Sequence, residues 1–375
     1  MLTRLSKNPW LDPAYMVATR NQNDISHGDM VNYFADRDDI DVIGLYIEGF
    51  KERDGLAFAR AVRRAVINGK EIVVYKAGQT PAGKNATIGH TASIAGDYGV
   101  CDAVLTQAGA MVAREFSEFG ELFYAAGCLH DKKIYGNRLG AVSGAGFETV
   151  GMADSIQTRN CSMQMARLEE STLARLADIL KAKKLDALME IRNPFDINPG
   201  ADDEAHLLCT AALAEDPNVD AVVVGLDPLS PMMMALAECS RPGFDIKNDK
   251  SIANTLPKLA AQMEKPIIGI IEGGALYDPF AEQLMNQGVC IFRACDRGVM
   301  ALVRYVQGRL HAERIRKTGM LYLPGRRAGQ GEGAHCRQGP SGTGELKTHT
   351  CRAGLGRPII GGASPALQDH GQRSG

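Results

Sequence analysis

The stretch KAGQTPAGKNATIGHTASIAGDYGVCDAVLTQAG, residues 76–109, directly follows the apolar run 72–75. A short apolar run of this kind is typical of a buried strand. Residues 79–96 are almost all small or polar, which predicts a long loop instead of a packed helix or a paired strand. Long loops are uncommon in compact domains and often carry function. A functional group is therefore expected just beyond this strand.

His90 lies in the middle of the predicted loop, between Gly89 and Thr91. Neutral imidazole suits chemistry near pH 7, where it can act as a base, a ligand or a nucleophile. Nothing bulky surrounds His90 in the sequence, so a solvated loop histidine is the alternative, and local sequence alone favours it.

Predicted strands and helices alternate on both sides of this stretch. The first series has strands at 14–19, 42–47, 71–75 and 111–113, and helices at 29–35 (with Asp29 as N-cap), 56–67, 98–108 and 116–126. The second series has strands at 139–142, 188–191, 221–226, 267–271 and 289–292, and helices ending near 156 and at 171–182, 204–214, 252–263, 279–286 and 296–309. This alternation predicts an α/β fold with doubly wound parallel sheets.

A glycine turn follows the strand at 139–142. Ser143, Gly144, Ala145 and Gly146 connect this strand to the next helix. Such a turn leaves backbone N–H groups free at the positive end of a helix, which suits phosphate. A tight turn that only connects two elements is an equally open interpretation.

Three segments of the first series recur in the second. Residues 20–25 (RNQNDI) match 192–197 (RNPFDI), 41–49 (DVIGLYIEG) match 220–228 (DAVVVGLDP), and 70–74 (KEIVV) match 265–269 (KPIIG). The matches indicate a duplicated domain. The expected domains are 1–130 and 137–317. The first copy shows no counterpart of the second copy's opening strand and glycine turn, so its start is expected to be truncated.

Composition excludes several functional classes. The net charge of −2 gives no reason to expect nucleic acid or an anionic membrane as partner. No apolar run reaches the length of a membrane span, and the start MLTR is unlike a signal peptide, so a cytoplasmic protein is expected. The nine cysteines include no CxxC pair, so neither a metal site nor a disulfide framework is expected.

Residues 318–375 differ in character from the rest. They are rich in glycine, arginine and histidine and show no apolar periodicity. Such a composition cannot bury enough surface to fold, which predicts a disordered tail. A stretch translated in a wrong reading frame is the other interpretation.

Several of these motifs resemble one enzyme family. Residues 89–96 (GHTASIAG) with 107–109 (QAG) resemble the phosphohistidine loop of succinyl-CoA synthetase and of ADP-forming acyl-CoA synthetases. Residues 47–49 (IEG) resemble the strand end whose glutamate partners that histidine, and 142–146 (VSGAG) and 193–196 (NPFD) resemble turns of the second ligase domain. The resemblance covers about residues 1–317 and implies two flavodoxin-like domains.

The resemblance implies a role for each candidate residue. His90 would carry a phosphoryl group, Glu48 would hold its ring, and Gly144, Ala145 and Gly146 would bind phosphate. The implied enzyme is an ADP-forming acid–thiol ligase, which interconverts acyl-CoA, ADP and phosphate with a carboxylic acid, CoA and ATP. Coenzyme A and ADP or ATP with magnesium would be its substrates, without a prosthetic group.

The family's CoA-binding Rossmann domain and its ATP-grasp nucleotide domain have no counterpart in this sequence. The expectation is therefore a fragment or subunit that works with both domains within an oligomer, on a carboxylic acid that the sequence does not identify. A non-catalytic CoA-sensing module, like the ligase-like domains fused to acetyltransferases, is the main alternative. An inactive remnant is the third.

Overall fold

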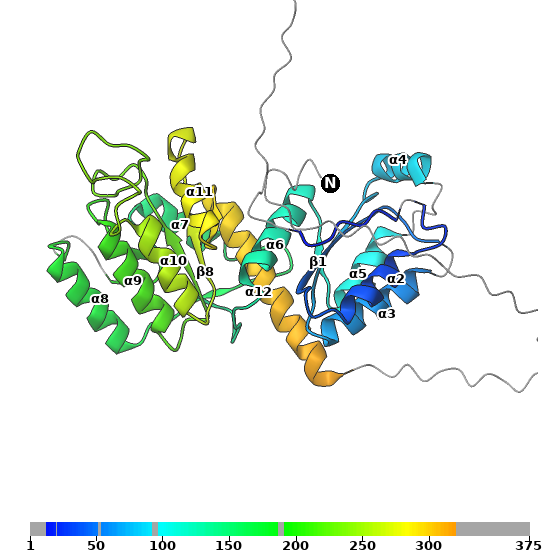
Figure 1. Ribbon diagram of the computed structural model, residues 1–375. Coiled ribbons are helices and arrows are strands. Elements are labelled where there is room, and N and C mark those ends of the chain that lie inside the picture. The colour runs from blue at the N-terminus through cyan, green and yellow to red at the C-terminus, as the bar shows by residue number, and fades with distance from the viewer. Residues whose placement is uncertain (1–12, 20, 52–53, 92–96, 187–190, 320–375) are drawn as a thin grey trace, which may run out of the picture. The chain divides into compact units, whose positions relative to one another are not determined.

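The computed structural model describes residues 13–19, 21–51, 54–91, 97–186 and 191–319. Their strands form two sheets, and every strand pairing within these sheets is parallel (Figure 1). Helices connect successive strands. The predicted α/β class with parallel sheets is confirmed. No described helix combines the length and the apolar character that crossing a membrane requires.

The first sheet has the strand order β1-β2-β3. Its strands are β1 (Val42–Ile47), β2 (Glu71–Lys76) and β3 (Met111–Ala113). The helices of this part are α2 (His27–Ala35), α3 (Asp54–Ile67), α4 (Pro81–Thr91), α5 (Tyr98–Ala108) and α6 (Phe116–Leu129). Five of the six β2 residues are buried, as expected of a central parallel strand covered on both faces.

The second sheet has the order β5-β4-β7-β8-β9, and β6 also pairs with β4. Its strands are β4 (Arg138–Ser143), β5 (Gln164–Met165), β6 (Phe195–Asp196), β7 (Ala221–Gly225), β8 (Ile267–Ile270) and β9 (Cys290–Phe292). The helices are α7 (Gly146–Asp154), α8 (Glu170–Ala182), α9 (Asp203–Glu215), α10 (Ile252–Gln262), the 3₁₀ turn η1 (Ala275–Tyr277), α11 (Asp278–Asn286) and α12 (Cys295–Thr318). Leaving β6 aside and counting from β4, the order is 2-1-3-4-5, that of flavodoxin-like folds.

Strand register agrees with the internal repeat. The sequence match equates Ile43 with Val222 and Ile72 with Ile267. In the first sheet Ile43 lies opposite Ile72, and in the second Val222 lies opposite Ile267. The strands β1, β2 and β3 therefore correspond to β7, β8 and β9.

A pair of equivalent lysine contacts supports the same correspondence. Lys70 precedes β2 and donates from Nζ to the backbone oxygen of Arg37 at 2.6 Å. Its counterpart Lys265 precedes β8 and donates to the backbone oxygen of Asp216 at 2.6 Å. Each lysine thus ties the amino end of its strand to the loop that leads into the neighbouring strand.

The predicted strand at 14–19 and the predicted start of the first helix are wrong. Residues 14–19 pair with no strand among the described residues. Helix α2 begins at His27, and Ser26 is its N-cap. Asp29 is the third helical residue, where its carboxylate accepts from the Ser26 N–H at 2.9 Å while Ser26 Oγ accepts from the Asp29 N–H at 3.2 Å. This reciprocal capping box satisfies N–H groups that a cap at Asp29 would leave free.

The predicted long loop is partly helical, because α4 covers Pro81–Thr91. Thr80 Oγ1 accepts from the Gly83 N–H at 3.0 Å, and Pro81 occupies the first helical position. A capping threonine followed by proline favours a helix start. Residues 81, 82 and 84–86 are exposed, so this helix needs no apolar face, and the lack of apolar residues misled the prediction.

Two further predictions fall largely or wholly outside the described residues. They are the strand at 188–191 and the disordered tail at 318–375, of which the structure describes only residue 191 and residues 318–319. Sequence patterns also missed β5 and β6, because strands of two residues are too short to show alternation.

Candidate functional site

The first candidate residue, Glu48, stands at the carboxyl end of the first sheet. It directly follows β1, is half-buried, and accepts a long hydrogen bond of 3.5 Å from the Tyr46 hydroxyl. Ligands of open parallel sheets bind outside the carboxyl ends of the strands. Glu48 therefore lies where a reacting group could meet it.

Lys76, the last residue of β2, holds this strand end in place. Its side chain is almost fully buried, with 1% exposed, and Nζ donates to the backbone oxygens of Glu48 at 2.8 Å and of Ala77 at 2.6 Å. Desolvation by burial lowers the pKa of Lys76. Sequence reasoning missed this residue, although a lysine that ends an otherwise apolar strand is a usable signal.

The backbone of His90 belongs to α4, the helix that follows β2. The connection contains Gly78 at φ +81°, a conformation that favours glycine, and a Cβ added there would lie 3.3 Å from Thr87 Oγ1. Helix α4 therefore packs closely on the strand end. The His90 side chain lies outside the described part of the structure, as do residues 92–96, so its predicted pairing with Glu48 stays a prediction.

The predicted glycine turn lies at the carboxyl end of β4, the equivalent edge of the second sheet. Ser143 Oγ accepts from the Ala145 N–H at 3.0 Å. A Cβ on Gly144 would approach His206 Nε2 to 3.0 Å, and one on Gly146 would approach Asp196 Oδ2 to 2.7 Å. Both glycines thus allow side chains to contact the turn closely.

Carboxyl groups surround this turn. Glu148, in the first turn of α7, is 2% exposed and accepts from Ser143 Oγ at 2.6 Å. Burial raises the pKa of Glu148 to about 7, and the negative charges of Glu272 and Asp227 act in the same direction. Near neutral pH the Glu148 carboxyl is therefore partly protonated, which reduces its repulsion of an anion at the turn.

His206 is a second buried group at the turn that sequence reasoning missed. Its Nδ1 lies 3.0 Å from the backbone oxygen of Asp202, and its Nε2 has no hydrogen-bond partner among the described residues. Desolvation by burial lowers its pKa, so the ring is neutral near pH 7. The repeated patterns do not single it out, since it lies within a helix that is buried nearly all round.

The two candidate groups are separate in the described structure. Glu48 and the backbone of His90 belong to the first sheet and its helices, whereas Gly144, Ala145 and Gly146 follow a strand of the second sheet. Among the residues described, no hydrogen bond or ion pair joins Glu48 to the glycine turn. The described part also holds no group of three or more His, Cys, Asp or Glu side chains able to bind a metal ion.

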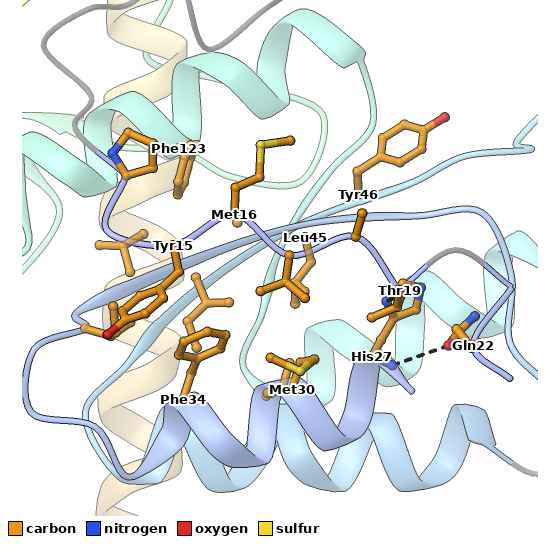
Figure 2. A pocket seen from close by; sticks show the side chains of 18 of the residues that line it. Tyr15, Met16, Thr19, Gln22, His27, Met30, Phe34, Leu45, Tyr46 and Phe123 are labelled. Carbon is orange, nitrogen blue, oxygen red and sulfur yellow. Dashed lines mark hydrogen bonds between the residues drawn. The ribbon is translucent and has the colours of Figure 1, made fainter. Parts of the chain in front are cut away.

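A cavity of about 730 Å³ opens beside β1 and reaches Glu48 (Figure 2). One end is polar: His27 Nδ1 lies 3.1 Å from Thr19 Oγ1, and the His27 N–H donates to Gln22 Oε1 at 3.3 Å. The rest is mainly apolar, and its lining includes Tyr15, Met16, Met30, Phe34, Leu45 and Phe123.

Comparison with known families and proteins points to one group of enzymes. Residues 1–128 match the model of the succinyl-CoA ligase like flavodoxin domain. The chain is 27% identical over 293 residues to the alpha subunit of acetate–CoA ligase [ADP-forming] II of Pyrococcus furiosus, a match that covers 78% of this chain and 58% of the subunit. It is 32% identical over 182 residues to acetate–CoA ligase [ADP-forming] of Methanocaldococcus jannaschii, covering 48% of this chain and 24% of that protein.

A solved structure shares the fold. The dinucleotide-forming acetyl-coenzyme A synthetase 1 of Ca. Korarchaeum cryptofilum, in complex with phosphate and ADP, superposes with a TM-score of 0.64 at 23% identity. The match covers 78% of this chain and 59% of that one. The matches span 58%, 24% and 59% of the lengths of these three proteins. Residues 1–128 are thus similar in sequence to the succinyl-CoA ligase like flavodoxin domain, and longer stretches of the chain are similar to ADP-forming acetate–CoA ligases.

Proposed function

We propose that this chain is the phosphohistidine-carrying part of an ADP-forming acyl-CoA ligase and that His90 carries the phosphoryl group. One observation carries the proposal: the 1–128 match to the ligase-like flavodoxin domain includes both Glu48 and His90. The structure supports it, because Glu48 directly follows β1 while the backbone of His90 belongs to the helix that follows the adjacent strand β2.

The chemistry divides into three transfers. A phosphate oxygen attacks the acyl carbon of acyl-CoA, the thiolate of CoA leaves, and an acyl phosphate forms. A ring nitrogen of His90 then attacks phosphorus and the carboxylate leaves. Finally an oxygen of the ADP β-phosphate attacks phosphohistidine, and ATP leaves with the imidazole restored. Phosphoryl transfer depends mainly on positioning and charge stabilisation, which a rigid sheet edge can supply.

In this scheme Glu48 accepts a hydrogen bond from one ring N–H of His90. That bond fixes the tautomer and leaves the other nitrogen free to attack. It also stabilises the positive charge that develops on the ring as the N–P bond forms. The half-buried position of Glu48 strengthens this interaction, since partial exclusion of water lowers the local dielectric.

The glycine turn would serve a phosphate group in the second domain. The amino end of α7 offers backbone N–H groups at Gly144, Ala145 and Gly146, although the Ala145 N–H already donates to Ser143. The raised pKa of Glu148 favours its uncharged form beside the turn. We assign this role to domain 137–317 and the phosphohistidine to domain 1–130.

Complete turnover would need a CoA-binding Rossmann domain and an ATP-grasp domain or subunit. The curated relatives named above are longer than the part this chain matches, and one of them is named as an alpha subunit. Coenzyme A, a carboxylic acid and the nucleotide with its magnesium would be substrates of that assembly. We place it in the cytoplasm as an oligomer.

The test is phosphorylation of the histidine itself. The 375-residue chain is mixed with an ATP-grasp subunit of an ADP-forming ligase and γ-labelled ATP, and label stable to base but labile to acid is counted. His90→Ala should abolish the label, whereas His130→Ala, which alters an exposed histidine at the end of α6, should keep it. Label retained in His90→Ala would refute the assignment, and no label in the unaltered chain would favour the non-catalytic alternative.

A further inference from the structure

Carboxyl groups gather around the glycine turn of the second sheet. Glu148 lies in the first turn of α7, Asp196 ends β6, and Asp227 and Glu272 lie just beyond β7 and β8. Asp196 Oδ2 would lie 2.7 Å from a Cβ on Gly146. Among the described residues, no lysine, arginine or histidine forms an ion pair with any of these carboxyl groups. A phosphate group bound at the turn therefore needs another source of positive charge.

Glu148 differs from the other carboxyl groups in its hydrogen bonding. It is buried, and its carboxyl contacts the Ser143 hydroxyl at 2.6 Å. Each of the others accepts from a backbone N–H: Asp196 from Asn198 at 2.9 Å, Asp227 from Leu229 at 3.0 Å, and Glu272 from Cys295 at 2.6 Å. A backbone N–H can only donate, whereas a hydroxyl can donate to a carboxylate or accept from a carboxylic acid. Glu148 can therefore gain a proton and keep its hydrogen bond.

Gly225, the last residue of β7, leaves the space that this arrangement needs. A Cβ on Gly225 would collide with Glu148 Oε2 and would lie 2.5 Å from Ser143 Oγ. The same Oγ accepts from the Ala145 N–H at 3.0 Å, so one fully buried hydroxyl connects the Glu148 carboxyl to the backbone of the turn. Because water is excluded here, a change of charge on Glu148 acts strongly on an anion at the turn.

His206 gives a second, independent indication of a ligand at the turn. Its Nδ1 lies 3.0 Å from the backbone oxygen of Asp202, which can only accept, so we assign the ring hydrogen to Nδ1 and an acceptor lone pair to Nε2. The side chain is fully buried, and Nε2, without a partner among the described residues, would lie 3.0 Å from a Cβ on Gly144. An unpaired buried acceptor costs free energy. A phosphate group that carries a proton would bring a hydrogen-bond donor to this side of the turn.

We propose that Glu148 takes up a proton when a phosphate group occupies the glycine turn, and that this proton offsets part of the negative charge of the phosphate. The proposal rests on the phosphate-binding role proposed above for the turn and adds the residue that regulates it. Burial raises the pKa of Glu148 to about 7, and the charge of a bound phosphate should raise it further. Because the occupied turn holds the proton more tightly, phosphate binding weakens as pH rises through about 7.

The other groups near the carboxyl ends of these strands are less suited to supply the charge. Arg293, just beyond β9, pairs with Asp278 and donates to backbone oxygens that follow β8. Burial lowers the pKa of His206, so its ring stays neutral near pH 7. Cys295 contacts the Glu148 backbone oxygen at 3.6 Å, and burial raises the pKa of its thiol to about 12. Glu148 is therefore the group at the turn that changes charge near neutral pH.

The test uses the full chain and inorganic phosphate. NMR signals of the Gly144, Ala145 and Gly146 amides give the Kd of phosphate from pH 6 to pH 8, and the signal of the Glu148 carboxyl carbon reports its protonation. At pH 8 this carboxyl should be mostly charged without phosphate and mostly uncharged when phosphate saturates the turn.

Glu148→Gln keeps an acceptor for the Ser143 hydroxyl but cannot titrate. The Kd of the unaltered chain divided by that of Glu148→Gln should increase about tenfold from pH 6 to pH 8, and the titration of phosphate itself cancels in this ratio. Glu272→Gln is the matched control, because it removes a neighbouring negative charge that the Cys295 N–H holds in place. It should strengthen binding by about the same factor at every pH.

A Kd ratio that is equal at pH 6 and pH 8 would overturn the coupling, as would a Glu148 carboxyl signal that phosphate leaves unchanged. The carboxyl signal is measured on the unaltered chain, so it decides the question even if Glu148→Gln does not fold. Either result leaves the phosphate role of the turn intact. Turn amides that respond to phosphate at no pH would refute that role together with the coupling, while the labelling of His90 tests the phosphohistidine separately.

Discussion

Glu48 offers the sharpest test of the proposed chemistry at the level of one residue. Glu48→Gln keeps the size of the side chain and removes the charge that would stabilise the developing imidazolium. We expect phosphorylation of His90 to slow by roughly tenfold to a thousandfold, the range for one lost acid–base or electrostatic partner. The rate of labelling from γ-labelled ATP in the presence of the ATP-grasp subunit measures this.

The repeat supplies a matched control for that substitution. Asp227 is the counterpart of Glu48 at the end of β7, and its Oδ1 accepts from the Leu229 N–H at 3.0 Å. Asp227→Asn should leave the labelling rate within about twofold, because our scheme gives Asp227 no contact with His90. Equal rates in Glu48→Gln and the unaltered chain would show that Glu48 only ends a strand.

Lys76 should affect the phosphorylation of His90 by holding Glu48 in position. Lys76→Met removes the two hydrogen bonds from Nζ to the Glu48 and Ala77 oxygens, which should lower the free energy of unfolding by about 1–3 kcal/mol. It should also slow His90 phosphorylation about tenfold or more, since small displacements of a catalytic partner are costly. Denaturant unfolding and the labelling assay measure the two effects separately.

Lys70→Met is the matched control, because Lys70 also donates from a buried position to a backbone oxygen but at the amino end of β2. It should lose stability with an unchanged labelling rate. If both variants slow phosphorylation equally under conditions where both are folded, Lys76 has only a structural role.

At the level of helices and strands, the elements with strong apolar patterns were predicted correctly from the sequence. The predicted helix at 98–108 and the predicted strands at 42–47 and 111–113 agree with α5, β1 and β3 to the residue. Strands buried in a parallel sheet have near-continuous apolar runs, and such runs can be recognised from the sequence alone. The same reasoning predicts that the IEG motif (47–49) and the GHT motif (89–91) lie after strands.

The elements that were predicted wrongly depend on specific contacts and not on hydrophobic periodicity. Helix α4 forms from a capping threonine and a proline start, and residues 14–19 pair with no described strand although their composition suits a strand. Lys76, Glu148 and His206 owe their properties to burial by elements distant in sequence. Such burial follows from the tertiary fold, which local patterns do not contain.

At the scale of the whole molecule, α12 connects the two sheets. It packs against α3 and α6 and also against α7, β8 and β9. A largely buried cluster reinforces this packing. Arg309 Nη1 lies 2.6 Å from Glu71 Oε1, and the Tyr305 hydroxyl donates to the same oxygen at 3.2 Å. Glu71 begins β2, so the ion pair joins the last described helix to the first sheet.

The Glu71–Arg309 pair should therefore govern stability and its pH dependence. Arg309→Met leaves the Glu71 carboxyl buried without its cation, which should cost about 3–5 kcal/mol of unfolding free energy. Adding Glu71→Gln should recover part of that loss, because no charge is then left unpaired. Arg37→Met breaks the exposed pair with Asp39 and should cost far less, because solvent screens that pair.

The direction of the pH effect follows from the pKa of Glu71. Burial raises the pKa of Glu71 to about 7, because its effect exceeds the opposite effect of the Arg309 charge. The contribution of Glu71 to stability is therefore present below its pKa in the unfolded state and declines as pH rises through about 7. Without Arg309 the pKa of Glu71 should rise further. The deficit of Arg309→Met measured by urea unfolding should then be larger at pH 8 than at pH 5, whereas the Glu71→Gln/Arg309→Met double variant should lose this difference. A deficit that does not change with pH would mean that Glu71 does not titrate in this range and that α12 is held to the sheet by apolar packing.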